Sequence, residues 1–237
     1  MARRTVDTVD VRIDPKNSGS ILQLMANVYR NIYSVIIEYV QNAADDTARQ
    51  IKETGKLPPS PLKITIDIDG KTGDISILDN GRGIALEALK KFATDPCSPT
   101  IDKNGNTIRA GIGVHTFRSY FKKATFRTKS KGTKLLELTF QRGDENLGGN
   151  KIEEIGGEEE DFPYESGTQV VLSGVAPTNK KPYKVSTRYL KNKIEERFGQ
   201  FIGKWLEVTI CVDGKEDMVC KGSDAMVSGS QTVRVSV

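Results

Sequence analysis

The chain has few residues of the kinds that bind metals or form covalent crosslinks. It contains one histidine and three cysteines among 237 residues. A single histidine, His115, excludes a multi-histidine metal site and leaves little basis for a serine–histidine catalytic triad. The cysteines, at positions 97, 211 and 220, are odd in number and lack the spacing of zinc ligands. We therefore expect reduced thiols and a cytoplasmic protein.

Long apolar segments are also missing. No stretch approaches the roughly 18 consecutive apolar residues of a transmembrane helix, so we expect no membrane partner. The first seven residues, Met-Ala-Arg-Arg-Thr-Val-Asp, lack the apolar centre of a signal peptide. A Walker A phosphate loop is absent, because Gly70-Lys71-Thr72 has the ending of that motif but Thr65 stands where its first glycine belongs.

The composition that remains is typical of a soluble globular protein. Hydrophobic residues make up 37% of the chain and charged residues 28%, and the net charge is +4. That charge is too small to indicate nucleic-acid binding by itself. The length predicts one domain over residues 1–237. We expect a core over about residues 15–176, with a C-terminal helix and strands over about residues 183–237 packed on it.

One segment with helical periodicity carries a polar stripe. Apolar residues recur at three- and four-residue spacing between Ile32 and Ala44. Glu38, Asn42 and Asp45 are separated by four and then three residues, which places them along one edge of that apolar face. Such residues are usually a solvated helix face. The alternative is that a carboxylate, an amide and a second carboxylate point into one cavity.

A second motif follows a short strand-like run over residues 75–78. It reads Asp79-Asn80-Gly81-Arg82-Gly83-Ile84. By itself this is an ordinary turn sequence, since Asn-Gly favours a positive φ. The two glycines also let the backbone come close to a ligand. Asp79 at the strand end can accept a hydrogen bond from an exocyclic amine such as that of adenine.

The other predicted elements follow from alternation, caps and turn residues. We expect strands over residues 6–13, 62–69, 75–78, 124–129, 134–142, 168–173, 206–212, 217–220 and 232–237. We expect four helices among these elements. The first is capped by Asn17 or Ser18, the second carries the polar stripe and ends near Gly55, the third covers residues 86–92, and the fourth runs from 185 to about 201. Residues 153–161 are predicted to be a solvated charged loop.

Two further segments lie where a ligand could be bound. Residues 94–109 have the composition of a loop, and their position predicts either a mobile lid or an ordinary surface loop. Gly111-Ile112-Gly113-Val114 then opens a predicted helix that reaches residue 120 or 121. Backbone amides at a glycine-rich helix start can bind an anion, although Gly-x-Gly is equally typical of a packing turn.

With these elements in order, the sequence resembles the GHKL ATPases, the superfamily of Hsp90, DNA gyrase B, MutL and the histidine kinases. Its Glu-x-x-x-Asn-(Ala/Ser)-x-Asp motif is matched by Glu38, Asn42, Ala43 and Asp45, and its Asp-x-Gly-x-Gly motif by Asp79, Gly81 and Gly83. Its phosphate-facing glycines are matched by Gly111 and Gly113, and its late Gly-Thr by Gly167-Thr168. The segment at residues 21–25 and Gln200-Phe201-Ile202-Gly203 look most like the Hsp90 N-terminal domain, whereas Asp-Asn-Gly-Arg-Gly is more similar to gyrase B or MutL.

The resemblance implies the Bergerat fold, an α+β two-layer α/β sandwich with a mixed, mostly antiparallel sheet and helices on one face. It implies ATP and Mg²⁺ as ligands. Glu38 would be the general base and Asn42 the Mg²⁺ ligand, while Asp79 would bind the adenine amine, supported by Thr168 through a water. The other implied nucleotide contacts are Asp45, Gly81, Gly83, Ile84, Ser98, Thr100, Gly111, Ile112, Gly113 and Val114.

The implied function is slow ATP hydrolysis that drives nucleotide-gated dimerisation or conformational change. The alternative is a regulatory module or protein kinase like the histidine kinases and anti-sigma kinases, although His115 within the glycine motif argues against self-phosphorylation. In relatives a lysine or arginine from a following domain completes the site, so we expect part of a longer protein with a downstream domain or protein partner. A homodimer could form through the N-terminal strand. Nucleic-acid binding stays open as a weaker idea on the basic residues Lys122, Lys123, Arg127, Lys129, Lys131 and Lys134.

Overall fold

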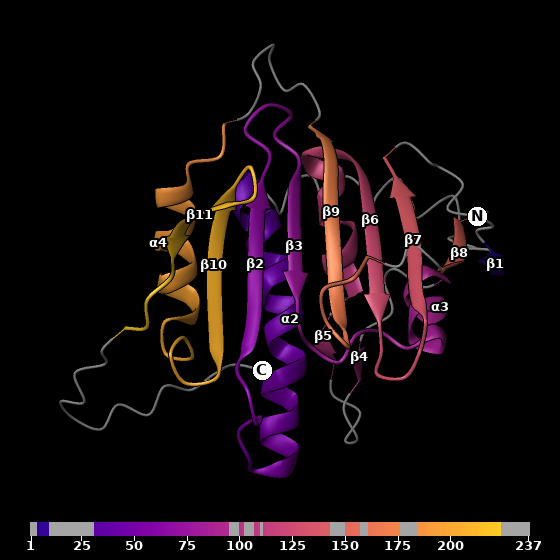
Figure 1. The fold of residues 1–237 in the computed structure, drawn as a ribbon, viewed down its shortest axis with the longest axis horizontal. Coiled ribbons are helices and arrows are strands. Elements are labelled where there is room, and N and C mark those ends of the chain that lie inside the picture. The colour runs from indigo at the N-terminus through magenta and orange to yellow at the C-terminus, as the bar shows by residue number, and fades with distance from the viewer. Residues whose placement is uncertain are drawn as a thin grey trace.

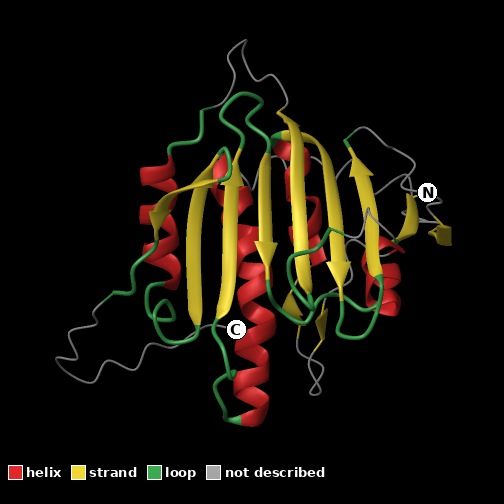
Figure 2. Ribbon diagram, viewed as in Figure 1, coloured by secondary structure: helices red, strands yellow, loops and turns green. Residues whose placement is uncertain are grey.

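A computed structural model describes residues 4–9, 31–94, 100–101, 107–109, 111–142, 150–156, 161–175 and 184–223. Within these ranges no helix is both long and apolar enough to cross a bilayer. Most of the described strands build one large mixed sheet, with helices on one of its faces (Figures 1 and 2). This arrangement confirms the predicted α+β sandwich.

The large sheet has nine described strands in the order β1-β8-β7-β6-β9-β3-β2-β10-β11. Their bounds are β1 Arg4–Val9, β2 Leu62–Ile68, β3 Ile75–Asp79, β6 Phe121–Lys129, β7 Leu135–Gln141, β8 Asn150–Ile155, β9 Gly167–Val175, β10 Leu206–Val212 and β11 Lys215–Val219. Neighbouring strands pair antiparallel except for β2 and β10, which are parallel. The sheet is therefore mixed and mostly antiparallel, as predicted.

Four described helical segments accompany the sheet. They are α2 (Ile32–Thr54), α3 (Leu86–Thr94), the 3₁₀ helix η1 (Gly111–Ser119) and α4 (Thr187–Phe198). In Figures 1 and 2, α2 runs behind β2 and β3, and η1 lies behind β9 and β6. The helices that carry the first motif and the phosphate-facing glycines thus share one face of the sheet.

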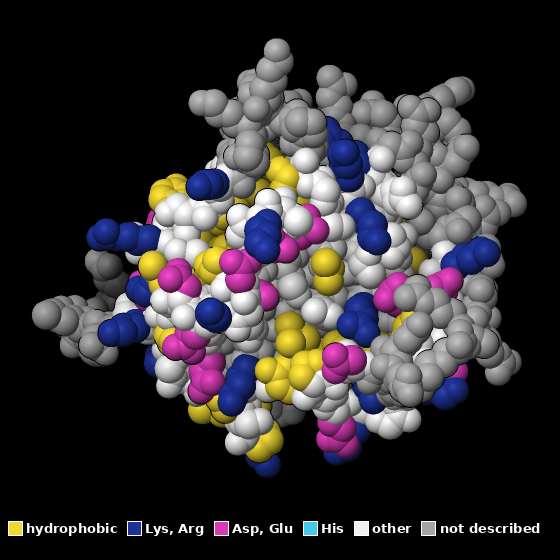
Figure 3. Space-filling model, turned by 45° about the horizontal axis from the view of Figure 1, so that its top comes forward, with side chains coloured by type: hydrophobic (Ala, Val, Ile, Leu, Met, Phe, Trp, Pro, Cys, Tyr) yellow, Lys and Arg dark blue, Asp and Glu magenta, His cyan; other side chains and the backbone are white. Residues whose placement is uncertain are grey.

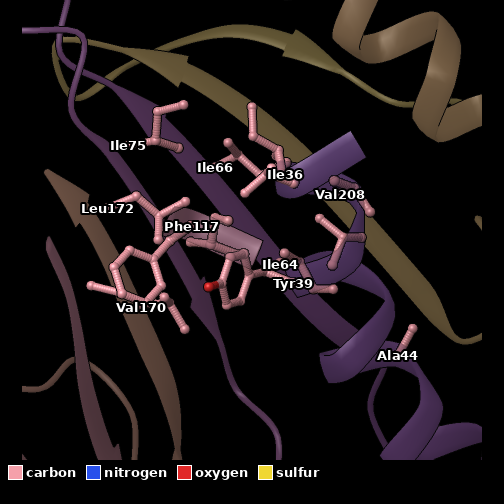
Figure 4. Close-up of a cluster of buried hydrophobic side chains, with 14 of the residues drawn as sticks. Ile36, Tyr39, Ala44, Ile64, Ile66, Ile75, Phe117, Val170, Leu172 and Val208 are labelled. Carbon is pink, nitrogen blue, oxygen red and sulfur yellow. The ribbon is translucent and has the colours of Figure 1, made fainter. Parts of the chain in front are cut away.

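The core lies between this helical layer and the sheet. In β2 the apolar residues alternate with polar ones, so Ile64 and Ile66 are buried while Lys63 is exposed. The buried side of α2 packs against them, and Figure 4 shows Ile36 and Tyr39 of α2 among these strand side chains. Burying one apolar face per strand fixes the register, because a shift by one residue would turn that face to solvent.

The predicted end of the motif helix near Gly55 is confirmed, and the structure adds the position of its start. Asn31 caps the start of α2 by accepting a hydrogen bond from the Ser34 amide at 2.9 Å. Gly55 ends the helix with φ 67°, a left-handed conformation that glycine adopts without steric cost. The predicted hairpin across Asp213-Gly214 is also present, as β10 and β11.

Three predictions about local structure were wrong in part. Residues 153–155 belong to strand β8 and not to a solvated loop, because Ile152 and Ile155 are buried and β8 pairs with both β1 and β7. The segment over residues 94–109 contains a two-stranded hairpin of β4 (Thr100–Ile101) and β5 (Thr107–Arg109). The glycine-led helix η1 has 3₁₀ geometry.

Several predicted features lie outside the described residues. They are the helix capped by Asn17 or Ser18, the strand over residues 232–237, residues 10–13 of the first strand, and Cys97 and Ser98.

Candidate functional site

The first motif sits on the helix edge that faces η1. Tyr39, Val40 and Ala44 of α2 are buried in the core, and this fixes the rotation of the helix. Glu38 and Asn42, one turn apart, are therefore half-buried at the border of the apolar face. Glu38 and Asn42 thus lie on one edge of the helix, as the spacing predicted, and this edge faces η1.

Gly113 of η1 brings the glycine element into contact with this stripe. A Cβ atom added at Gly113 would lie 2.5 Å from Glu38 Oε1 and 3.3 Å from Asn42 Nδ2. Even a methyl group at position 113 would displace the Glu38 carboxylate, so glycine is what lets η1 approach the two polar residues this closely. The structure thus brings together Glu38, Asn42 and Gly113, which are separated by more than 70 positions in sequence.

The second motif begins where β3 ends. Asp79 Oδ1 accepts hydrogen bonds from the backbone amides of Gly81 at 2.8 Å and Thr168 at 3.2 Å. Burial raises the pKa of the Asp79 carboxyl from 3.8 to about 6, against the effect of these two amides. Asp46 nearby adds a smaller repulsion in the same direction as burial. Among the described residues this partly buried carboxylate has no cationic partner, which leaves it suited to accept hydrogen bonds from a ligand.

The glycine loop after Asp79 lies directly against strand β6. A Cβ at Gly83 would collide with the Lys129 carbonyl, and Gly83 has a φ of +70° that side-chain-bearing residues rarely adopt. The next amide, that of Ile84, donates to Thr128 Oγ1 at 2.7 Å. The tight turn expected from the motif is present here, while the close approach that the structure shows is to the backbone of β6; the expected approach to a ligand stays a prediction.

Strand β9 supplies the other side of the Asp79 site. Thr168 pairs with Asp79 in the register of β3 and β9, and a Cβ at Gly167 would collide with the Asp79 carbonyl. The hydroxyls of Thr168 and Thr128 lie 3.0 Å apart. The late Gly-Thr pair therefore joins the Asp-x-Gly-x-Gly loop, as the order of the motifs predicted.

Asp46 is a structural partner that the sequence analysis missed. Its carboxylate accepts two hydrogen bonds from Arg82, from Nε at 2.9 Å and Nη2 at 2.7 Å, and it also contacts Arg49. Burial raises the pKa of the Asp46 carboxyl. The hydrogen bonds and positive charges of Arg82 and Arg49 outweigh burial and hold that pKa below its usual value. This bidentate pair connects α2 to the glycine loop. The spacing of Asp46 from Asn42, one helical turn, could have indicated it.

The remaining predicted residues divide into three groups. Ile84 is partly buried and packs against the core, and Val114 is buried. Asp45 lies half-buried on α2, and it is its neighbour Asp46 that pairs with the glycine loop. Thr100 lies in β4, and Gly111 and Ile112 begin η1. Ser98 lies outside the described residues. Nucleotide contacts at these positions stay predictions.

His115 is part of the core behind the glycine element. It is 2% exposed, and its ring packs edge-on against Phe140 with centroids 4.9 Å apart. Burial first, and the charge of Arg118 second, lower its pKa from 6.5 to about 3. His115 is therefore a neutral core residue whose Nδ1 accepts from Arg118 Nε at 3.3 Å.

The donor set fits a hard divalent cation held mainly by phosphate oxygens. In the described ranges no group of three or more His, Cys, Asp or Glu side chains could form a metal cage. Asn42 offers an amide beside the glycine element, and Mg²⁺ is commonly bound by one or two protein oxygens together with phosphates and waters. Asn42 is the residue that would hold the ion.

Comparison with known proteins agrees with this geometry. A family model described as "Histidine kinase-, DNA gyrase B-, and HSP90-like ATPase" matches residues 29–160, which is more than half of the chain. The match includes α2 with Glu38 and Asn42, the Asp79 loop and η1. A comparison with curated protein sequences gives no match. On the strength of the family match and the assembled motifs, the chain belongs to the histidine kinase-, DNA gyrase B- and HSP90-like ATPases, a nucleotide-binding family.

Proposed function

We propose that the chain binds ATP together with Mg²⁺ and hydrolyses it slowly, at the site between α2, the Asp79 loop and η1. The observation that carries this proposal is the contact of Gly113 with both Glu38 and Asn42. It places a carboxylate and an amide beside a backbone element suited to bind phosphate. Asp79 lies at the end of β3, in the sheet behind which α2 and η1 lie.

Each polar residue then has a distinct task. Glu38 accepts the proton of the attacking water as the water oxygen bonds to the γ-phosphorus and the bond from that phosphorus to the β,γ-bridging oxygen breaks, which releases ADP. Asn42 would hold the cation through its amide oxygen, and the bound cation would supply neutralisation of phosphate charge. Asp79 accepts a hydrogen bond from the adenine amine, and Thr168 supports that base through a water.

A pair of variants tests the assignment. Glu38→Ala should bind ATP like the wild type but lose single-turnover hydrolysis, because a general base acts on the water and not on the bound nucleotide. Asn42→Ala should instead lose the Mg²⁺-dependent part of ATP binding, measured as the difference in thermal stabilisation with and without Mg²⁺. Unchanged hydrolysis in Glu38→Ala would assign the base to another residue.

Nucleotide-gated dimerisation through the N-terminal strand is the conformational output that we propose. β1 is one of the two edge strands of the described sheet and pairs on one side with β8. An edge strand presents backbone groups that a second chain can pair with. Light scattering with a non-hydrolysable ATP analogue should show a dimer that ADP does not produce. The segment over residues 94–109 would act as the ATP-responsive lid, and a downstream domain or partner protein would complete the site.

The histidine-kinase alternative is supported less well. Self-phosphorylation needs an accessible histidine, and the sole histidine, His115, is 2% exposed. Phosphorylation of a separate protein is the form of the alternative that a kinase assay with partner candidates would test. A cytoplasmic location belongs to the proposal as well, on the expectation of reduced thiols.

Nucleic-acid binding gains little support from the surface. Arg127 forms an ion pair with Glu137 at 3.7 Å, Lys131 pairs with Glu165 at 3.3 Å, and Lys134 pairs with Glu154. Figure 3 shows basic and acidic side chains interspersed on the face that it presents. Basic residues that are neutralised by neighbouring carboxylates contribute little to phosphate binding.

A further inference from the structure

The residue after Glu38 makes a contact that the family motif does not require. Tyr39 is 3% exposed, and its ring lies in the core between α2 and the sheet (Figure 4). Its hydroxyl donates a hydrogen bond of 2.7 Å to the carbonyl of Val114, the residue that follows Gly113. Consecutive residues of a helix point in directions about 100° apart, so Glu38 and Tyr39 reach η1 at two different places.

The Tyr39 hydroxyl also lies beside two further residues of η1. The Thr116 side chain and the Phe117 backbone are close enough to lower the pKa of the phenol. Burial, the dominant cause, raises the pKa of Tyr39 well above its ordinary value, so the phenol stays protonated and keeps its donor at all working pH values. Thr116 Oγ1 in turn donates to the Gly113 carbonyl at 2.8 Å. Two consecutive carbonyls of the glycine element, those of Gly113 and Val114, thus each accept from a buried hydroxyl.

The geometry of η1 gives these hydroxyls a task. η1 is a 3₁₀ helix of nine residues, whereas 3₁₀ segments rarely exceed about three or four residues because their hydrogen bonds are poorly aligned. A segment of this kind needs support from outside its own backbone. Donors that hold the carbonyls at its glycine-rich start supply that support and fix where the Gly113 backbone lies relative to Glu38.

We propose that Tyr39 is a positioning residue for the hydrolysis described above: its hydroxyl holds the 3₁₀ form of η1 and thereby sets the place of the phosphate-binding glycine element against Glu38. The inference rests on the proposed ATPase function. Tyr39 touches no reacting atom. It acts through the Val114 carbonyl, so its loss changes the turnover rate more than the affinity for the base and ribose.

The test compares two identical substitutions on one helix. Tyr39→Phe removes the hydroxyl from η1. Tyr33→Phe, the matched control, removes a hydroxyl of α2 that accepts from the Ser186 amide of the α4 cap at 3.0 Å, far in sequence from the glycine element. We expect kcat to fall at least tenfold in Tyr39→Phe and to change less than twofold in Tyr33→Phe. ADP affinity should stay within twofold of wild type in both.

Amide hydrogen exchange supplies a readout that needs no turnover. Exchange at residues 113–117 should become faster in Tyr39→Phe and stay unchanged in Tyr33→Phe. A wild-type kcat with unchanged exchange in Tyr39→Phe would overturn the inference, and so would an equal loss of kcat in both variants. If wild-type protein binds ATP without hydrolysing it, the proposed function fails, and the exchange result alone decides the role of Tyr39.

If Tyr39→Phe fails to fold, a second pair of variants tests the same inference. Thr116→Val removes the hydroxyl that holds the Gly113 carbonyl, whereas Thr116→Ser keeps it. We expect a several-fold lower kcat in the valine variant and recovery in the serine variant. Equal kcat in both would overturn the inference, because the hydroxyls would then not position η1.

Discussion

Gly113→Ala provides a sharp test of the catalytic geometry. The added methyl group would lie 2.5 Å from Glu38 Oε1 and 3.2 Å from Glu38 Cγ, whereas ordinary contact begins at 3.4 Å. The carboxylate oxygen must therefore move by about 0.9 Å, the difference between these distances. Asn42 Nδ2, at 3.3 Å, needs to move only slightly.

The expected loss follows from the size of this shift. Misplacing a catalytic group by roughly 1 Å lowers the rate by about a hundredfold. That corresponds to about 2.7 kcal/mol of transition-state stabilisation. The fold should tolerate the change, because the displaced atom is the end of a flexible side chain. Alanine is also better than glycine within a helix, so we expect the free energy of unfolding to change by less than about 1 kcal/mol.

The assay is single-turnover ATP hydrolysis together with urea denaturation. Gly132→Ala is the control, since Gly132 has a φ of +75° but nothing within 4 Å of the added Cβ. Its backbone strain should cost about 1 kcal/mol of stability and leave hydrolysis unchanged. Introducing Gly113→Ala into Glu38→Ala should lower the rate no further, because the carboxylate that it displaces is gone. A wild-type rate in the single variant would refute the assignment of Glu38 as the base at this position.

Three further predictions concern the base-binding end of the site. Asp79→Asn should lower adenosine affinity roughly ten- to a hundredfold, because the amide N–H₂ of asparagine and the amine of adenine are both hydrogen-bond donors. A wild-type affinity measured by calorimetry would contradict this. The Asp79 carboxyl binds a proton more tightly in the unliganded folded state, with a pKa of about 6, than in the unfolded chain, with a pKa of 3.8. Protonation therefore adds about 3 kcal/mol to the free energy of unfolding below pH 4, and this contribution is lost as pH rises through 6. The difference in unfolding free energy between wild type and Asp79→Asn should therefore change across pH 4–7, and a flat difference would reject the raised pKa. Asp46→Asn should weaken adenosine binding several-fold, because it weakens the pair that holds the Arg82 loop against α2. Arg82→Lys cannot form the bidentate pair and should have the same effect. Wild-type adenosine affinity in both variants would show that the pair does not contribute to binding.

The sequence predicted the elements that one short pattern specifies. α2 has a continuous apolar face and a Gly55 stop, so the helix and its end could be found from local signals. β2 alternates over its whole length, and the Asp213-Gly214 turn marks the β10–β11 hairpin. In the same way, the spacing of Glu38 and Asn42 correctly placed them on one edge of a helix.

Strand β8 could not be predicted because its stability comes from neighbours distant in sequence. Its residues, Asn-Lys-Ile-Glu-Glu-Ile, are half charged, and the two isoleucines are three positions apart, which is not the period of a strand. Pairing with β1 and β7 overrides that local preference. The 3₁₀ form of η1 was missed for a related reason, since the hydroxyl of Tyr39 lies 75 positions from the carbonyl that it binds.

The Asp46–Arg82 pair was missed because two carboxylates stand side by side in the motif. Asp45 and Asp46 are both near the stripe of Glu38 and Asn42, and the sequence alone does not decide which one turns toward the loop. The outcome depends on the rotation of α2, which its buried residues determine, and on the path of the loop that carries Arg82.

The position of β9 has a consequence for how the chain folds during synthesis. β9 lies between β6 and β3, yet it is made after both of them, at residues 167–175. Until it leaves the ribosome, β3 has only β2 as a described antiparallel partner, and β6 has only β7. The two halves of the nascent sheet therefore present open edges that are prone to aggregation. We expect folding to wait for a single late strand, and a ribosome-bound chain that ends at residue 160, where the family match ends, to be sensitive to proteases.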